Sequence, residues 1–178
     1  MKKTILLLAV IFASCTSKLD FDQANELKIT PVFEGDMFFF DISKDDLIDS
    51  QSQFKSIIND TLDFGIFYNV NNRKHFVKAE ITIGYKNTFQ RSFHTEYIFI
   101  DENNQPVEQN SFDIQAADAT QNVEGEEIVI YSKTANPNFM NFRKIVVQIT
   151  VTPDTMPVDD KLLHIKTKGK IYTEVLIK

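Results

Sequence analysis

The side chains with the greatest potential for chemistry are three histidines, and their spacing is not that of a metal site. No two of them, and no histidine with the single cysteine, have the separation of a metal-binding pair. His94 and Glu96 would share one face of a strand and could hold a metal ion or a water molecule, although a solvated strand face is the simpler interpretation. The sequence lacks a Gly-x-Ser-x-Gly nucleophile elbow, and its five glycines form no phosphate-binding loop. We therefore predict no catalytic residue and no cofactor.

Two acidic stretches are candidates for a calcium site, because Ca²⁺ prefers oxygen ligands. Residues 101–112 begin like a calcium loop, but Pro106 stands where the sharp turn needs glycine and Phe112 stands where the last carboxylate is needed. A hairpin turn is the better interpretation of that stretch. The second group has no fixed ligand spacing, so we predict no metal site and keep its members only as candidate ligands. They are Asp41, Asp45, Asp46 and Asp49.

The first fifteen residues have the pattern of an export signal. Lys2 and Lys3 precede an apolar run, 5–13, that is too short to cross a membrane as a helix, which takes ~20 residues. The run suits the central region of a signal peptide. Residues 12–15, Phe-Ala-Ser-Cys, resemble the lipobox of bacterial lipoproteins. That resemblance implies a signal peptide at 1–14, cleavage before Cys15 and acylation of its thiol, with palmitate among the acyl chains. The alternative is an ordinary signal peptide with an incidental cysteine.

Acylation and charge together determine which partners we expect. Each buried CH₂ contributes about 0.8 kcal/mol to membrane binding, and stable anchoring needs more than one acyl chain, which a triacylated cysteine supplies. The formal net charge is −6, and loss of the two signal lysines makes the mature chain more acidic. Such a domain does not bind nucleic acid by general electrostatics. We predict a protein held by lipid at the outer membrane, on its periplasmic side or at the cell surface.

The rest of the chain is expected to form a tether and a single domain. Residues 15–26 are polar and predict a lipidated tether, and residues 27–178 are long enough for one core. An apolar fraction of 43% excludes a disordered chain, and a single cysteine excludes a disulfide framework. Sixteen phenylalanines predict an aromatic core.

Period-2 alternation predicts that this domain is built from strands. Residues 75–86 and 89–100 alternate and are expected to pair as one long hairpin, followed by a turn at 101–106. Residues 143–152 alternate until Pro153, and 163–177 keep one parity through Gly169, which predicts one long strand or two strands bent there. Residues 43–58 predict a short helix or an ordered loop. The remaining expected strands are 27–33, 36–42, 61–68, 107–115 and 126–133.

This pattern predicts an all-β protein: an antiparallel, immunoglobulin-like β-sandwich of about seven to nine strands with at most one short helix. Two tripeptides, Asp60-Thr61-Leu62 and Asp154-Thr155-Met156, resemble the acceptor of Bacteroidota O-glycosylation. Thr61 and Thr155 are therefore candidate glycosylation sites.

The signal, the segment KLDFDQANELKITPVFEGDMFFFDI and the segment ITIGYKNTFQRSFHTEYIFIDENNQPV together resemble small uncharacterised envelope lipoproteins of Bacteroidota, flavobacterial in style. The resemblance implies an envelope β-sandwich and carries no activity. Our leading hypothesis is a membrane-anchored, non-enzymatic lipoprotein that binds a protein partner or serves in an assembly. The alternatives are a ligand-binding module, for glycan, lipid or calcium, and, third, a hydrolytic enzyme.

Overall fold

The computed structural model describes residues 27–67, 69–152 and 161–176. Cys15, Thr155, the signal peptide and the tether lie outside these ranges, so the predictions made for them stay predictions. The chain divides into two compact units, and Thr30–Glu174 is the larger. In the smaller unit the described residues form a two-stranded antiparallel pair, β1 (Lys28–Ile29) with β10 (Val175–Leu176).

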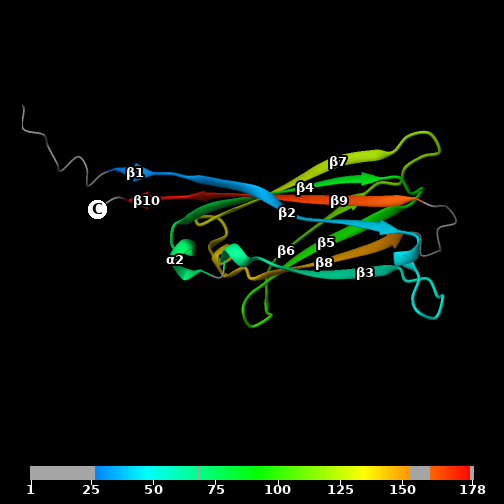
Figure 1. Cartoon of the computed structure of the whole chain (residues 1–178), viewed down its shortest axis with the longest axis horizontal. Helices are drawn as coiled ribbons and strands as arrows, with labels where there is room; N and C mark the ends of the chain where they lie inside the picture. The colour runs from blue at the N-terminus through cyan, green and yellow to red at the C-terminus, as the bar shows by residue number, and fades with distance from the viewer. Residues whose placement is uncertain (1–26, 68, 153–160, 177–178) are drawn as a thin grey trace, which may run out of the picture. The chain divides into compact units, whose positions relative to one another are not determined.

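The larger unit consists of eight antiparallel strands in two four-stranded sheets (Figure 1). The first sheet has the order β2-β9-β4-β7, and the second has the order β3-β8-β5-β6. The strands of the first sheet are β2 (Val32–Ser43), β9 (Leu162–Thr173), β4 (Phe76–Asn87) and β7 (Val123–Ser132). Those of the second sheet are β3 (Ile57–Asp63), β8 (Lys144–Thr152), β5 (Ser92–Ile100) and β6 (Pro106–Ile114).

The strand order confirms the predicted antiparallel β-sandwich and corrects its type. From β2 to β9, every connection between successive strands passes from one sheet to the other, except the connection from β5 to β6. This order is that of an eight-stranded jelly roll, whereas an immunoglobulin sandwich divides its strands as ABED and CFG. The predicted hairpin of 75–86 with 89–100 is also wrong, because β4 and β5 belong to different sheets. Alternation shows which face of a strand is buried and leaves its neighbours undetermined.

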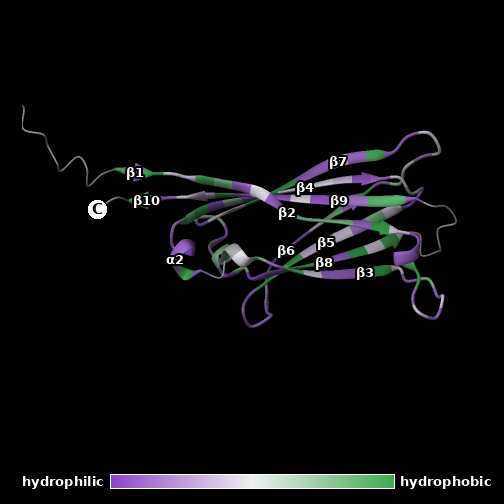
Figure 2. Ribbon diagram, in the orientation of Figure 1, coloured by the Kyte–Doolittle hydropathy of each residue, from purple (hydrophilic) through white to green (hydrophobic). Residues whose placement is uncertain are grey.

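The core lies between the inner faces of the two sheets and consists of aromatic and branched side chains. Figure 2 shows hydrophobic and hydrophilic residues alternating along the strands. Phe99 and Phe142 stack with ring centroids 4.4 Å apart, and Tyr131 meets Phe142 edge-on at 5.1 Å. Further aromatic rings of the same cluster are Phe64, Phe67, Phe76 and Phe139. Phenylalanine therefore marks the core, as predicted, with two exposed exceptions on β2, Phe33 and Phe39.

Long strand β9 keeps one alternation of faces through Gly169, in agreement with the unbroken parity of its sequence. The register shift in its pairing with β2 comes from an extra residue in β2. Residues 43–58 contain a 3₁₀ turn at Asp45–Leu47 and no α-helix. The one short helix of the described residues is α2 (Val70–Arg73), which begins where the Asn69 side chain accepts a hydrogen bond from the Asn71 N–H. Among the described residues no helix is long and apolar enough to cross a membrane.

Candidate functional site

In the described part of the chain, a hollow of about 360 Å³ lies on the inner side of β2. Gly35 on β2 is paired directly with Gly169 on β9. Both glycines occupy positions whose side chains would face the second sheet, because their neighbours in register, Phe33 with Ile171 and Phe40 with Ile165, face it. A Cβ atom added to Gly35 would meet nothing within 4 Å. The hollow therefore exists because Gly35 carries no side chain.

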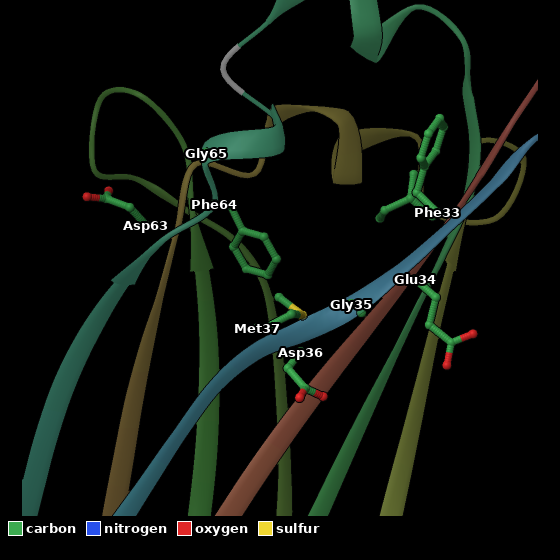
Figure 3. Close-up of a pocket in the computed structure, with 10 residues that line it drawn as sticks. Phe33, Glu34, Gly35, Asp36, Met37, Asp63, Phe64 and Gly65 are labelled. Carbon is green, nitrogen blue, oxygen red and sulfur yellow. The ribbon is translucent and has the colours of Figure 1, made fainter.

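A β-bulge in β2 supplies one wall of the hollow. The register with β9 shifts between Asp36 and Phe38, so Met37 is an extra residue in its strand. Its thioether lies where a side chain on Gly169 would be: a Cβ there would come within 2.7 Å of the Met37 sulfur. Figure 3 shows Met37 beside Phe64, which follows the end of β3. The opposite wall is formed by Phe33 and Ile171.

Three carboxylates line the hollow: Asp63 at the end of β3, and Glu34 and Asp36, which form ion pairs on the outer face of the first sheet. Glu34 lies 3.2 Å from the ammonium of Lys170, and Asp36 lies 3.2 Å from that of Lys166. Hydrogen bonding and charge from Glu34 raise the pKa of Lys170. Figure 3 shows Glu34 and Asp36 directed away from Met37 and Phe64. The interior can therefore take an apolar side chain or a similar small apolar group.

The N-terminal half of β2 is exposed on both faces, from Val32 to Asp36. Phe33 is 56% exposed although it faces the second sheet, because β2 and β3 are both edge strands and the hollow opens between them. An edge strand presents unpaired N–H and C=O groups to an incoming strand. Strand edge and apolar hollow thus lie side by side.

The four aspartates considered as calcium ligands lie in the last part of β2 and in the loop after it. Three of their carboxylates have separate hydrogen-bond partners, and the four do not point to one common site. Asp41 accepts from His164 at 2.5 Å, Asp46 accepts from the Ser43 N–H and hydroxyl, and Asp49 accepts from the N–H groups of Gln51 and Gln53. The bonds from Ser43 lower the pKa of Asp46. Asp45 lies in the 3₁₀ turn. In the described ranges no three His, Cys, Asp or Glu side chains are grouped as a metal site.

The histidines are held apart on different surfaces. His94 contacts the Asp113 carboxylate at 2.7 Å on β6, and Glu96 accepts from Gln109, so these two strand-face neighbours do not converge on a common site. Both His–Asp pairs are largely exposed, with about half of each side chain open to solvent. His75 bonds the backbone carbonyl of Glu174. Among the described residues the histidines bond Asp113, Asp41 and the Glu174 carbonyl, and none of these bonds joins a histidine to a serine or threonine hydroxyl.

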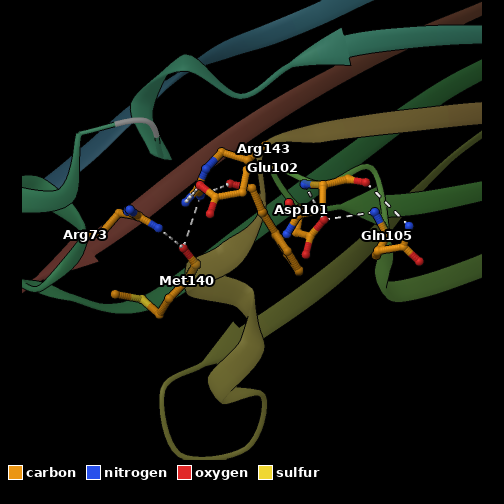
Figure 4. A network of polar contacts seen from close by, with 8 residues as sticks. Arg73, Asp101, Glu102, Gln105, Met140 and Arg143 are labelled. Carbon is orange, nitrogen blue, oxygen red and sulfur yellow. Dashed lines mark hydrogen bonds and ion pairs between the residues drawn. The ribbon is translucent and has the colours of Figure 1, made fainter.

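A buried arginine near the aromatic end of the sandwich has a structural role (Figure 4). Arg143 is 5% exposed and donates to the carbonyl of Phe142 at 2.7 Å and to that of Met140 at 3.4 Å. Arg73 also donates to the Met140 carbonyl, at 3.3 Å, and Glu102 lies 3.8 Å from Arg143. These bonds satisfy the carbonyls of the 3₁₀ turn at Pro137–Asn141 and fix it over the core.

Thr61 is exposed on β3, at an edge of the second sheet, and its N–H bonds the neighbouring Asp60 carboxylate. Its hydroxyl is therefore accessible to a modifying enzyme.

The sequence does not predict the hollow, because the pairing of the two glycines is known only once the register of β2 and β9 is known. The sequence offers little signal for it, because four of the five glycines lie within strands and only Gly35 and Gly169 are paired with each other.

No protein-family model matches the chain, and no curated protein matches it by sequence. Similar solved structures include the VP2 subviral particle of infectious bursal disease virus, 8% identical with a TM-score of 0.47, over 81% of this chain and 32% of that one. A candidate secreted protein from Parabacteroides distasonis is 19% identical with a TM-score of 0.38, over 83% and 38%. The Desmodium yellow mottle tymovirus structure is 13% identical with a TM-score of 0.36, over 84% and 91%.

This chain spans about a third of the VP2 chain that it matches. The likenesses are too distant to carry a function from those proteins to this one. The jelly-roll assignment rests on the strand order of this chain.

Proposed function

We propose that this protein is a lipid-anchored, non-enzymatic module of the cell envelope that binds a partner protein. The anchor is Cys15, supported by the lipobox-like residues 12–15. The observation that carries the binding role is the apolar hollow at Gly35 and Gly169, open beside the exposed half of edge strand β2.

The partner presents an extended segment with one large apolar side chain. The segment pairs with the free edge of β2, since strand addition supplies main-chain hydrogen bonds in many peptide-binding domains. Its side chain enters the hollow and contacts Met37 and Phe64. Side chains in such pockets give strand addition its specificity.

The decisive variant fills the hollow without disturbing the fold. Gly35→Val places a branched side chain where nothing lies within 4 Å, and valine favours extended backbone. We expect this variant to fold with unchanged or higher stability and to lose its partner. Gly84→Ala is the matched control: it also replaces a strand glycine at a position with room, and Gly84 belongs to the outward-facing row of β4.

The measurement is crosslinking in cells followed by purification of the three forms of the protein. Proteins recovered with wild type and Gly84→Ala but absent with Gly35→Val support the proposal. Equal recovery with all three forms would contradict it.

The ligand-binding alternative is favoured by the same hollow, whose volume is within the range of small-molecule sites, about 300–1,000 Å³. Thermal unfolding with glycans, lipids, Ca²⁺ and EDTA separates the two. A shift of the melting temperature that one of these compounds causes in wild type and not in Gly35→Val would favour a small ligand over a protein.

A further inference from the structure

The opposite edge of the first sheet is formed by β7, which pairs with β4 on one side and with no described strand on the other. Ile128 and Ile130 project from its outer face and are 55% and 53% exposed. Natural edge strands often prevent pairing by a bulge, a proline or charged side chains, including inward-pointing ones. The pairing of β7 with β4 runs from Val123 to Ser132 without a register shift and the strand contains no proline, but it carries three glutamates, of which Glu127 lies in the inward-facing row. Such an edge is open to a strand that places a positive charge beside Glu127.

The charges along this edge are separated by sign. Glu127 lies in the inward-facing row, opposite Ile83, is exposed, and has no hydrogen bond or ion pair to any residue of the described ranges. Glu124 and Glu126 precede it on the outer face. At the other end Lys133, the first residue of the turn after β7, donates its N–H to the carbonyl of Val77, so one further bond joins it to β4. Within the described ranges its ammonium contacts the Lys74 carbonyl, at 3.4 Å.

We propose that a second copy of this chain pairs antiparallel with β7, about a two-fold axis through Val129. In this register Ile128 lies opposite Ile130 of the second copy, and Ile130 lies opposite its Ile128, so the exposed isoleucines cover one another. Directly opposite residues on one face of an antiparallel pair are about 5 Å apart, close enough for such contact. A two-fold axis makes the interface self-complementary and closed, so pairing stops at two copies.

The same register joins the unlike charges. Glu127 lies opposite Tyr131 of the second copy and diagonal to its Lys133, and diagonal neighbours at about 7–8 Å are within reach of long side chains. Gly125, which lies opposite Lys133 of the second copy, leaves room for the lysine. Glu126 lies opposite Ser132. A parallel pairing would instead set the glutamates of the two copies against each other, which disfavours it.

This interface is independent of the hollow, because β2 and β7 are the two opposite edges of the first sheet. The partner segment proposed above therefore remains free to bind when two copies are joined. The two proposals can fail separately.

The test exchanges charges in the full-length chain, produced in cells with two different affinity tags. Wild-type copies should co-purify. In E127K and in K133E alone, recovery of the second tag should fall about tenfold, because two attractive pairs become repulsive. The double variant E127K/K133E should recover, and E127K mixed with K133E should form a mixed pair. E126K is the matched control and should pair like wild type, with thermal unfolding confirming that every variant is folded.

Absence of co-purification between wild-type copies would overturn the proposal. So would equal recovery in every variant, because the tags would then be joined by some other surface. Loss of pairing in the single variants without restoration in the mixed pair would refute the register.

Discussion

At the scale of single residues, aspartate side chains organise three of the loops. Asp49, Asp101 and Asp118 each accept hydrogen bonds from N–H groups two to four residues further along the chain. Residues 49–53 and 101–105, DSQSQ and DENNQ, form the same loop, in which the fourth residue has a positive φ. Aspartate and the fourth residue thus replace the glycine that such loops often use.

The fourth residue differs between these two loops, and this predicts a stabilising substitution. Ser52 has φ 63° and Asn104 has φ 58°. Asparagine tolerates this left-handed region better than serine, since its amide can bond locally. Ser52→Asn should raise the free energy of unfolding by about 0.5 kcal/mol, measured by urea denaturation. Asn104→Ser, the reverse change in the matching loop, should lower it, and no effect in either variant would argue against strain at Ser52.

The loop carboxylates also predict a dependence of stability on pH. Hydrogen bonds from the N–H groups of Gln105 and Asn103 lower the pKa of Asp101, and those of Thr120 and Gln121, together with the Thr120 hydroxyl, lower that of Asp118. A carboxyl whose pKa is lower in the folded state stabilises the fold above its unfolded pKa of about 4. This stabilisation is lost as the pH falls through the folded pKa.

The midpoint of urea unfolding should therefore fall below about pH 4 in wild type, and fall less steeply in Asp101→Asn/Asp118→Asn. A pair of curves that remain parallel from pH 7 to pH 2.5 would contradict this assignment. The neutral Asp113→Asn variant controls for loss of a carboxylate elsewhere, because Asp113 bonds a histidine side chain and no loop N–H.

At the scale of the strands, the bulge at Met37 and the glycine at position 169 form one packing unit. A Cβ atom at Gly169 would lie 2.7 Å from the Met37 sulfur and 3.1 Å from its Cγ. Gly169→Ala should therefore destabilise the fold by about 1 kcal/mol, at the low end for overpacked positions, because the flexible Met37 side chain can move toward the hollow. Met37→Ala combined with Gly169→Ala should be more stable than the two single effects predict. Strict additivity in this double-mutant cycle, measured by chemical denaturation, would show that the two residues do not share the space.

The strands also show how much of this fold the sequence predicts. Alternation located the strands now seen as β4, β5, β8 and β9, because one face of each is buried. It did not show that β4 and β5 lie in different sheets, since either pairing buries the same side chains. Residues 61–68 were expected to be a strand, but β3 ends at Asp63 and a 3₁₀ turn follows at Gly65–Phe67. There the side chains of Phe64 and Phe67 pack into the core. These tertiary contacts favour the turn over a continued strand, and they cannot be inferred from residues 61–68 alone.

The candidate site could not be predicted from the sequence, for a related reason. The hollow depends on which residues of β2 and β9 are opposite each other, and on the extra residue in β2. Neither the strand pairing nor the bulge can be inferred from a short stretch of sequence, because both depend on contacts between distant segments. By contrast, the turn at 101–106 was predicted correctly, because the hydrogen bonds that form it are made within five residues.

At the scale of the whole molecule, we propose that an acyl group on Cys15 holds the protein at the membrane. Cys15→Ser should then move the protein from the membrane fraction to the soluble fraction, because the acyl chains that supply the membrane affinity are lost. Immunoblotting of fractionated cells is the measurement. Persistence of the variant in the membrane fraction would contradict lipid anchoring, and protease treatment of intact cells distinguishes surface from periplasmic exposure.

The connections that alternate between the two sheets have a consequence for how the chain acquires its fold. Only β5 and β6 are both sequential and paired; the other strand pairs of the sandwich join segments separated by at least one further strand. β2 pairs with β9, so the first and last strands of the sandwich must both be present before the first sheet is complete. Folds with such non-local pairings form slowly, in milliseconds to seconds or longer. A chain that folds only when its last strand is available remains unfolded throughout its synthesis, which is the state in which an exported protein can be threaded across a membrane.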